Sequence, residues 1–140
     1  AFAILMGSSR AFYGKFGDKI NLERFMQYSA VLCMVSYLMI AFIPVPALGI
    51  LGCAVCGLSV GIMWPGTFSM AAASVKRGGT ALFALLALAG DVGCSSGPTY
   101  VGMISGALND NLKLGIFAAL IFPVLMIMGI KMIGSLRKYD

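Results

Sequence analysis

Long runs of apolar residues without a charge constrain this chain more than any other feature. Residues 80–107 form the most informative run, because Asp91 is the only charged side chain in it. A helix needs about 20 mostly apolar residues to cross the ~30 Å hydrocarbon core of a bilayer. Residues 25–43, 47–75 and 114–130 form three further runs with no charge. The sequence therefore predicts an all-α protein, a polytopic bundle of transmembrane helices.

The composition also favours a membrane location. Hydrophobic residues make up 60% of the chain and charged residues 11%, whereas soluble domains carry roughly 25% charged residues. The net charge of +5 would suit nucleic acid, but the basic residues lie at the ends of the apolar runs, where lipid headgroups are expected. We therefore expect the lipid bilayer, and not nucleic acid, as the partner.

The positions of the basic residues predict the orientation. Of the ten Lys and Arg residues, all but Lys113 fall in the segments 8–24, 76–77 and 131–140. Four spans would place these three segments on the same side of the membrane. An excess of Lys and Arg marks the cytoplasmic side. We therefore expect a multi-pass protein of the cell membrane with a cytoplasmic C-terminus.

The two ends of the chain have different characters. Residues 1–7 are apolar and look like the end of an earlier span, and residues 8–24 are too charged and too rich in Gly to lie in lipid. We expect a cytoplasmic loop with a short helical start over 8–24 and a cytoplasmic tail over 131–140. Residues 1–140 would then be the C-terminal fragment of one transmembrane domain, and the missing N-terminal helices of the same protein would be its partners.

Proline and asparagine mark the irregular points of the spans. A straight helix over 47–75 would be about 43 Å long, which exceeds the ~30 Å core. Pro65 is expected to kink it, because proline removes a helical hydrogen bond. Pro123 is a candidate kink in the last span. The residues 109–111 predict a polar turn, and each of them is able to cap the following helix.

Glycine divides the spans into two classes. The spans 47–75 and 80–107 are rich in Gly, whereas 25–43 and 114–130 carry bulky apolar side chains. Small residues allow helices to approach closely in a membrane. We therefore expect the two Gly-rich spans to be inner and the other two to face lipid. The glycines expected to pack against helices are Gly57, Gly61, Gly93 and Gly97.

Asp91 is the candidate residue for transport and proton coupling. An ionisable side chain inside a span is expensive and is usually functional. Asp91 would lie about 18 Å along the helix from Gly79, near the middle of the core. It would be neutralised by a proton or by a cation from another helix. The competing interpretation is a structural residue that bonds to a hydroxyl or amide of a neighbouring helix.

Three further side chains are candidates to line a cavity: Ser59, Trp64 and Ser95. A tryptophan beside a solute can stack on it, but Trp64 is also explained as an aromatic that packs near the kink at Pro65. Ser59 and Ser95 are explained equally by hydroxyls that bond to the backbone of their own helices. These alternatives remain open from the residues alone.

The charged segment also carries a recognisable motif. Gly14, Asp18 and Lys19 match the pattern G-x-x-x-D-[RK]-x-G-[RK]-[RK] of the major facilitator superfamily, and Arg10 lies one turn before it. Residues 21–23 depart from the pattern where it has Gly and two basic residues. In that family the motif lies between the second and third helices of each six-helix half. Its Asp meets the N-terminus of a helix in the other half and latches one conformation.

The order of the segments extends the resemblance to the whole chain. A motif loop followed by four spans and a tail is similar to the end of helix eight through helix twelve of a major facilitator transporter. In that family helices ten and eleven line the central cavity, and helices nine and twelve face lipid. The run over 78–98 also resembles helix eleven of proton-coupled sugar permeases of the fucose-permease type. The resemblance implies alternating access, a small-molecule solute such as a sugar, and protons.

Other functional classes find less support in the residues. The chain has no His and one carboxylate within its spans, so it offers no acid–base pair and we do not expect an enzyme. Cys53 and Cys56 form a CxxC without a second ligand pair, so we expect no metal and no cofactor. A secondary active transporter is the leading hypothesis. A non-transporting membrane scaffold or assembly subunit is the alternative.

Overall fold

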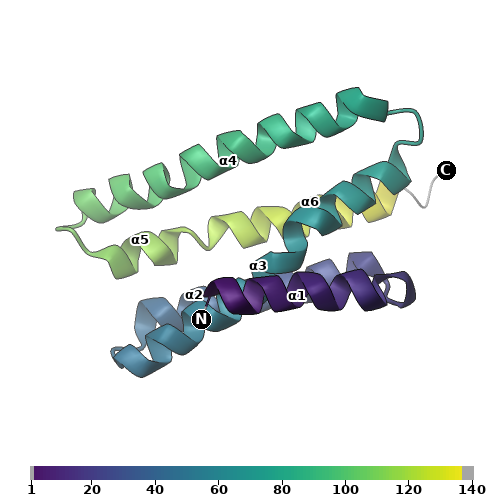
Figure 1. Cartoon of the computed structure of the whole chain (residues 1–140). Helices are drawn as coiled ribbons and strands as arrows, with labels where there is room; N and C mark the ends of the chain where they lie inside the picture. The colour runs from purple at the N-terminus through teal and green to yellow at the C-terminus, as the bar shows by residue number, and fades with distance from the viewer. Residues whose placement is uncertain (1, 137–140) are drawn as a thin grey trace.

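The computed structural model describes residues 2–136, and every regular element among them is a helix (Figure 1). Four helical stretches are long and apolar enough to cross a membrane. The prediction of an all-α protein with membrane-spanning helices is thus confirmed at this level. The elements are α1 (Phe2–Phe16), the short 3-10 helix η1 (Gly17–Lys19), α2 (Leu22–Phe42), α3 (Pro46–Ser74), α4 (Gly79–Ala107), α5 (Leu112–Ala118) and α6 (Ile121–Leu136).

The first helix is much longer than the sequence indicated. We expected a span end over 1–7 and a loop over 8–24, but α1 continues to Phe16 and α2 already begins at Leu22. Arg10 and Lys15 are exposed on α1, so their charges are compatible with a helix that packs through another face. The loop is therefore corrected to a short connection that contains η1. The expected tail over 131–140 is also helical as far as Leu136, and its last four residues lie outside the described part.

Helices α2 and α3 form the most closely packed part of the molecule. Met26, Cys33 and Ile62 are buried there. Two glycines of α3 make the close approach possible. A Cβ atom added at Gly52 would lie 2.8 Å from the side chain of Ile40, and one added at Gly66 would lie 2.9 Å from that of Met26. The core of the described chain therefore lies along α3, which also packs against α1 on another side.

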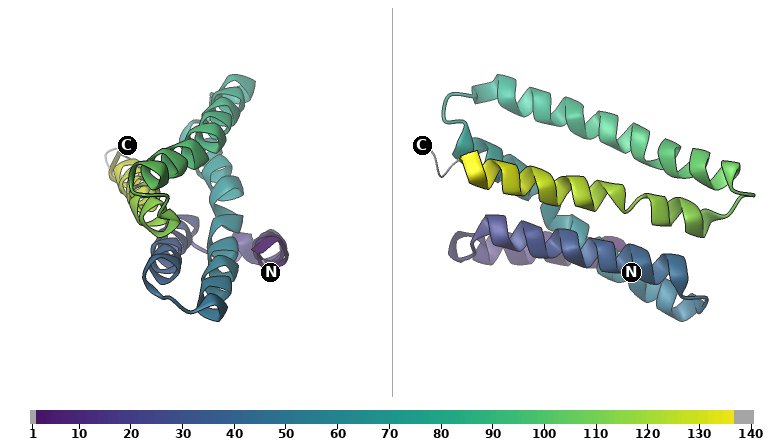
Figure 2. Two further views of the ribbon diagram at one scale, coloured as in Figure 1. Left: turned by 90° about the vertical axis from the view of Figure 1, so that its left-hand side faces the viewer. Right: turned by 180° about the vertical axis from the view of Figure 1, so that it is seen from behind.

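Helix α4 lies on the opposite side of the molecule from α1, and α3 crosses between them (Figures 1 and 2). Its contact with α3 is short and includes the stacked rings of Phe68 and Phe83, whose centroids are 5.7 Å apart. Its main contact is with α5, where Gly115 lies against the backbone of Val101. Ser105 is the only buried residue of α4. The expectation that 47–75 and 80–107 are both inner spans therefore agrees with the burial of α3, whereas the described helices leave α4 mostly exposed.

The last span is interrupted. A single helix was expected over 114–130, but α5 ends at Ala118 and α6 begins at Ile121. Proline has no N–H to donate to the carbonyl four residues earlier. Accordingly, the carbonyl of Ala119 accepts from the N–H of Phe122 (3.1 Å) and not from Pro123. The break thus lies one turn before this proline, whereas α3 continues through Pro65.

The turn between α4 and α5 uses the three polar residues that the sequence singled out. Asn109 and Asp110 have φ angles of 57° and 56°, in the left-handed region that Asn and Asp tolerate better than most residues. Asn111 is the N-cap of α5, and its side-chain oxygen accepts from the N–H of Lys113 at 3.2 Å. Of the three capping candidates, the structure thus selects Asn111.

The basic segments lie together at one end of the bundle. The C-terminal ends of α1, α3 and α6 and the N-terminal ends of α2 and α4 meet there (Figure 1). Lys19 on η1 and the turn residues Lys76 and Arg77 therefore share this end. Lys113 follows the turn at the opposite end. Apart from Arg10, whose Nε contacts the carbonyl of Gly61 in the middle of α3, the helices thus sort the described basic residues as the four-span topology requires.

Candidate functional site

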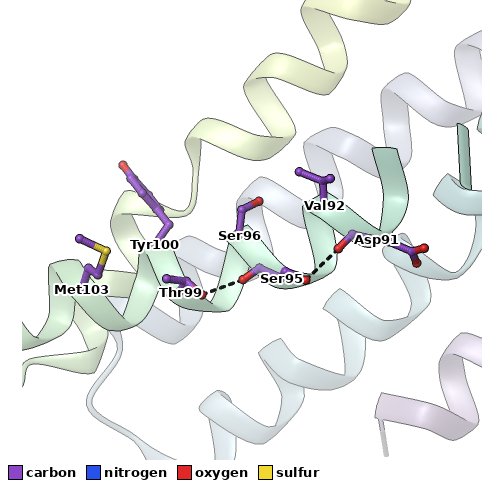
Figure 3. A pocket seen from close by; sticks show the side chains of 7 residues that line it. All are labelled: Asp91, Val92, Ser95, Ser96, Thr99, Tyr100 and Met103. Atoms are coloured by element: carbon purple, nitrogen blue, oxygen red, sulfur yellow. Dashed lines mark hydrogen bonds between the residues drawn. The ribbon is translucent and has the colours of Figure 1, made fainter. Parts of the chain in front are cut away.

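A polar stripe runs along the middle of α4. Its residues line a shallow, open depression of about 620 Å³ on the exposed side of this helix (Figure 3). In Figure 3, Asp91 lies at one end of the stripe and Met103 at the other. Residues four apart share one face of a helix, which explains why so many polar side chains gather here. The residues that line the depression are Asp91, Val92, Ser95, Ser96, Thr99, Tyr100 and Met103.

The hydroxyl groups of the stripe bond to their own helix. Ser95 Oγ donates to the carbonyl of Asp91 at 3.0 Å, and Thr99 Oγ1 donates to the carbonyl of Ser95 at 2.7 Å. This is the competing interpretation that the sequence left open for Ser95. A hydroxyl that donates to the backbone still has lone pairs with which to accept. The hydroxyls of Ser95 and Thr99 are therefore still able to accept hydrogen bonds, although most of the exposed surface of the depression is apolar.

Pro98 frees one backbone acceptor of α4 close in sequence to the stripe, although neither Pro98 nor Cys94 lines the depression. Because Pro98 has no N–H, the carbonyl of Cys94 lacks its normal partner four residues later. No described side chain donates a hydrogen bond to this carbonyl. Free carbonyls of irregular membrane helices are tolerated where they face a cavity or protein, and in transporters they contribute to binding sites. The freed carbonyl is close in sequence to both Asp91 and Ser95.

Trp64 is the one other candidate that the fold brings near the stripe. It belongs to α3, and a Cβ atom added at Gly90 of α4 would collide with its ring. The ring is also 4.9 Å from that of Phe68, centroid to centroid. Trp64 is 45% exposed, and Gly90 immediately precedes Asp91. It does not line the depression, so it lies beside the candidate site and packs the two helices together.

Ser59 lies elsewhere in the molecule. It is buried, and its hydroxyl donates to the carbonyl of Cys56 at 2.8 Å. The expectation that Ser59 lines a cavity together with Ser95 is therefore corrected. Because a buried hydroxyl needs a hydrogen-bond partner, Ser59 donates to the backbone of its own helix and is not available to a solute.

The structure does not gather the motif residues into one cluster. Arg10 and Gly14 belong to α1, and nothing lies within 4 Å of a Cβ atom added at Gly14. Asp18 and Lys19 belong to η1 and are exposed. Gly17 permits the turn of η1 to pass close to Tyr13, whose ring lies 3.1 Å from an added Cβ. The exposed position of Asp18 at the basic end is compatible with the role that the family resemblance implies.

Arg10 has a different contact, which the sequence did not reveal. Its Nε donates to the carbonyl of Gly61 on α3 at 3.1 Å. Gly61 precedes Pro65 by four residues, so Pro65 leaves this carbonyl without its helical partner. The arginine therefore replaces the hydrogen bond that proline removes. Pro65 marks the freed carbonyl in the sequence, but nothing there points to Arg10 as its partner, because Arg10 and Gly61 are 51 residues apart.

The four packing glycines divide into two pairs. A Cβ atom added at Gly57 would lie 2.5 Å from the carbonyl oxygen of Phe2, and one added at Gly61 would lie 2.8 Å from that of Met6. This pair is a helix contact between α3 and α1. Nothing described lies within 4 Å of an added Cβ at Gly93 or Gly97. The expectation of close packing at Gly93 and Gly97 is therefore not met among residues 2–136.

Sequence reasoning missed three members of the stripe: Ser96, Thr99 and Tyr100. The spacing of four from Asp91 through Ser95 was a signal for Thr99, whereas Ser96 and Tyr100 follow Val92 at the same spacing in the adjacent row, which no acid marks. Within the described part of the chain, no group of three His, Cys, Asp or Glu side chains is placed to hold a metal ion. Comparisons of this chain with protein-family models, with curated proteins and with solved structures give no match.

Proposed function

We propose that the chain is part of a secondary active transporter of the major facilitator type. It moves a small polar solute, with a sugar as the candidate, across the cell membrane by alternating access and in exchange with or together with protons. One observation carries the proposal: a carboxylate and several oxygen acceptors form an exposed stripe in the middle of a membrane-length helix. Such a stripe needs water, a solute or other protein against it, because lipid offers no hydrogen bonds.

The position of Asp91 supports coupling to protons. It lies about 18 Å along α4 from Gly79, far from both ends of the helix. An ionised Asp at the centre of a bilayer costs roughly 2.5–3.5 kcal/mol on insertion scales. Binding a proton, or pairing with a cation on another helix of the transporter, removes this cost. A carboxyl group that takes a proton on one side of the membrane and releases it on the other couples the solute to the proton gradient.

The orientation is part of the proposal. The basic end of the bundle, which carries Arg77, faces the cytoplasm, and the α4–α5 turn at Asn109 faces outside. Cysteine placed at either position in a background without native cysteines tests this. An impermeant thiol reagent added to intact cells is expected to label position 109 and to leave position 77 unlabelled. Labelling of both positions from outside contradicts the proposed topology.

A membrane scaffold or assembly subunit is the second candidate, and one observation favours it. Helix α4 exposes nearly its whole surface, and a polar stripe in lipid is also a suitable face for another protein's helix. A scaffold would use Asp91 and the hydroxyls as interhelical hydrogen-bond partners. The two functions differ in whether the acid must ionise, and this decides the experiment.

The test replaces Asp91 with Asn, which keeps the shape and the hydrogen-bonding capacity of the side chain but cannot ionise. The transporter proposal expects Asp91→Asn to abolish uphill accumulation of solute under an imposed proton gradient. Exchange of solute down its own gradient is expected to persist at least in part. Candidate sugars are screened first in membranes that contain the parent protein, and then uptake is measured with and without the gradient.

Asp110→Asn is the matched control, because Asp110 is an acid of the same chain that lies in the α4–α5 turn. The Asp110→Asn variant is expected to accumulate as much solute as the parent protein does. The abundance of each variant in the membrane is measured alongside uptake. If Asp91→Asn accumulates solute as well as the parent does, Asp91 is a packing residue and proton coupling through it is wrong.

A further inference from the structure

A second hollow lies at the basic end of the molecule. It is a groove of about 1060 Å³ between α3, α4 and α6, with α2 at its base. Its volume is slightly above the range of pockets that hold drug-sized ligands, about 300–1,000 Å³. The groove is separate from the polar stripe, with which it shares no residue. The residues that matter for its chemistry are Met70, Lys76, Arg77, Leu86, Gly129 and Ile130.

The body of the groove is apolar. Helix α6 contributes Met126, Gly129, Ile130 and Ile133, which are spaced three and four residues apart and so share one face. The side chains of Met70 and Leu86 come from α3 and α4 on the other sides. The short contact between α3 and α4 leaves this space open between them. A flexible hydrocarbon chain fits such a surface, because methionine and branched aliphatic side chains offer no hydrogen bonds.

The mouth of the groove is positively charged. Lys76 and Arg77 line it from the turn between α3 and α4, and both are exposed. No Asp or Glu among the described residues lines the groove. Basic pockets between transmembrane helices attract anionic lipid headgroups. A hydrocarbon body with a cationic mouth at the end of a membrane-spanning bundle matches a molecule with an acyl tail and a phosphate.

We propose that this groove binds one anionic phospholipid. Its acyl tail lies between α3, α4 and α6, and its phosphate contacts Lys76 and Arg77. This site requires only that the helices cross a membrane, so it does not depend on the transport proposal. Lys76 and Arg77 lie in the turn at the end of α3, where the headgroups of the bilayer are expected, so the phosphate of a lipid would meet them there.

The experiment uses the protein reconstituted in phosphatidylcholine vesicles that contain phosphatidylglycerol with a photoreactive diazirine on one acyl chain. After illumination, labelled peptides are identified by mass spectrometry. The expected label falls on α6 around Ile130 and on α3 around Met70. A phosphatidylcholine probe with the same photoreactive chain is expected to label these residues far less, because it has no net negative charge.

Two kinds of variant separate the headgroup from the tail. Lys76→Gln with Arg77→Gln is expected to weaken the interaction roughly 30-fold, since each cation near an anionic headgroup contributes about a 5-fold gain. Gly129→Leu is expected to block the tail while leaving both cations in place. Nothing lies within 4 Å of a Cβ atom added at Gly129, so this variant has room to fold. Lys113→Gln, at the other end, is the control and is expected to change nothing.

Three outcomes overturn the proposal. Equal labelling by the two probes means that the groove does not select an anion. Displacement of the probe by millimolar inorganic phosphate means that the cations bind free phosphate and the tail is incidental. Absence of label from α6, while exposed residues of α4 are labelled, means that another helix fills the groove. Loss of selective labelling in both the charge variant and Gly129→Leu, with the Lys113→Gln control unchanged, supports it.

Discussion

Helices α3 and α4 are alike in sequence and unlike in surroundings. Each has 29 residues, an internal proline and two glycines four residues apart. In α3 eight residues are buried, whereas in α4 Ser105 alone is. A comparison of α3 with α4 therefore shows which properties come from the sequence of a helix and which come from the helices packed against it. Length, small residues and an internal proline are shared, whereas α4 has a lower mean hydropathy than α3 (1.4 against 2.0), carries Asp91 and has fewer fitting partners among the described helices.

The glycine pairs show this difference most directly. Gly57 and Gly61 receive the backbone of α1, whereas Gly93 and Gly97 face open space in the described chain. The spacing of the two pairs is identical. A glycine pair thus permits close packing without causing it. The partner must bring a surface of the right shape, and α1 does so with the carbonyls of Phe2 and Met6.

The prolines give the same lesson in terms of hydrogen bonds. Pro65 frees the carbonyl of Gly61, and Arg10 of α1 donates to it at 3.1 Å. Pro98 frees the carbonyl of Cys94 on the exposed side of the bundle, beside the polar stripe. The carbonyl of Gly61 receives a hydrogen bond from the neighbouring helix, and this bond stabilises the contact between the two helices. The carbonyl of Cys94 receives none from a described side chain and is available to a solute or to another helix.

The largest difference is expected between leucine substitutions in the two glycine pairs. Gly61→Leu forces the side chain against the backbone of Met6 and is expected to lower the free energy of unfolding by about 3 kcal/mol. Gly93→Leu meets no described atom and is expected to leave stability nearly unchanged. Thermal unfolding of the two purified variants in the same detergent measures the difference. Equal destabilisation by both substitutions would show that α4 is packed as closely as α3.

A smaller effect is expected from the arginine. Arg10→Met leaves the carbonyl of Gly61 without a donor and is expected to cost about 1 kcal/mol. Pro65→Ala restores an N–H to that carbonyl, so in this background the loss of Arg10 is expected to cost much less. A double-mutant cycle by thermal unfolding measures this coupling. Lys15→Met on the same helix is the control. Additive effects of Arg10→Met and Pro65→Ala would show that Arg10 does not replace the hydrogen bond that Pro65 removes.

Much of the fold was visible in the sequence because it depends on local chemistry. The spans expected over 25–43, 47–75 and 80–107 correspond to α2, α3 and α4, since runs of apolar residues bounded by Asn21, Pro46 and the turn after Ser74 set their limits. The extension of α1 was missed, because its charges were assigned to a loop. An arginine can belong to a helix when it projects from it and finds an acceptor, as Arg10 does.

The sequence predicted the candidate site only as far as it lies along a single helix. The acid at position 91 and the hydroxyl at 95 stood out by composition, and the helical spacing extends them to Thr99. The separation of Ser59 from the stripe was not predictable, because it depends on which face of α3 turns toward α2. The packing of Trp64 on Gly90 was likewise set by the crossing of two helices. Such crossings depend on three-dimensional contacts that no single run of residues specifies.

The contact between α1 and α3 has a consequence for movement. Phe2, Met6 and Arg10 follow one another at intervals of four residues, and so do Gly57, Gly61 and Pro65. The backbone of Phe2 lies against Gly57 and that of Met6 against Gly61, and Arg10 donates to the carbonyl of Gly61 that Pro65 leaves free. The two helices run in the same direction. A shift by one residue would misalign every pair at once. Because both series repeat every four residues, the pairs are able to form again only after a shift of four residues, or about 6 Å of helix, so any sliding between the helices is stepwise and not continuous.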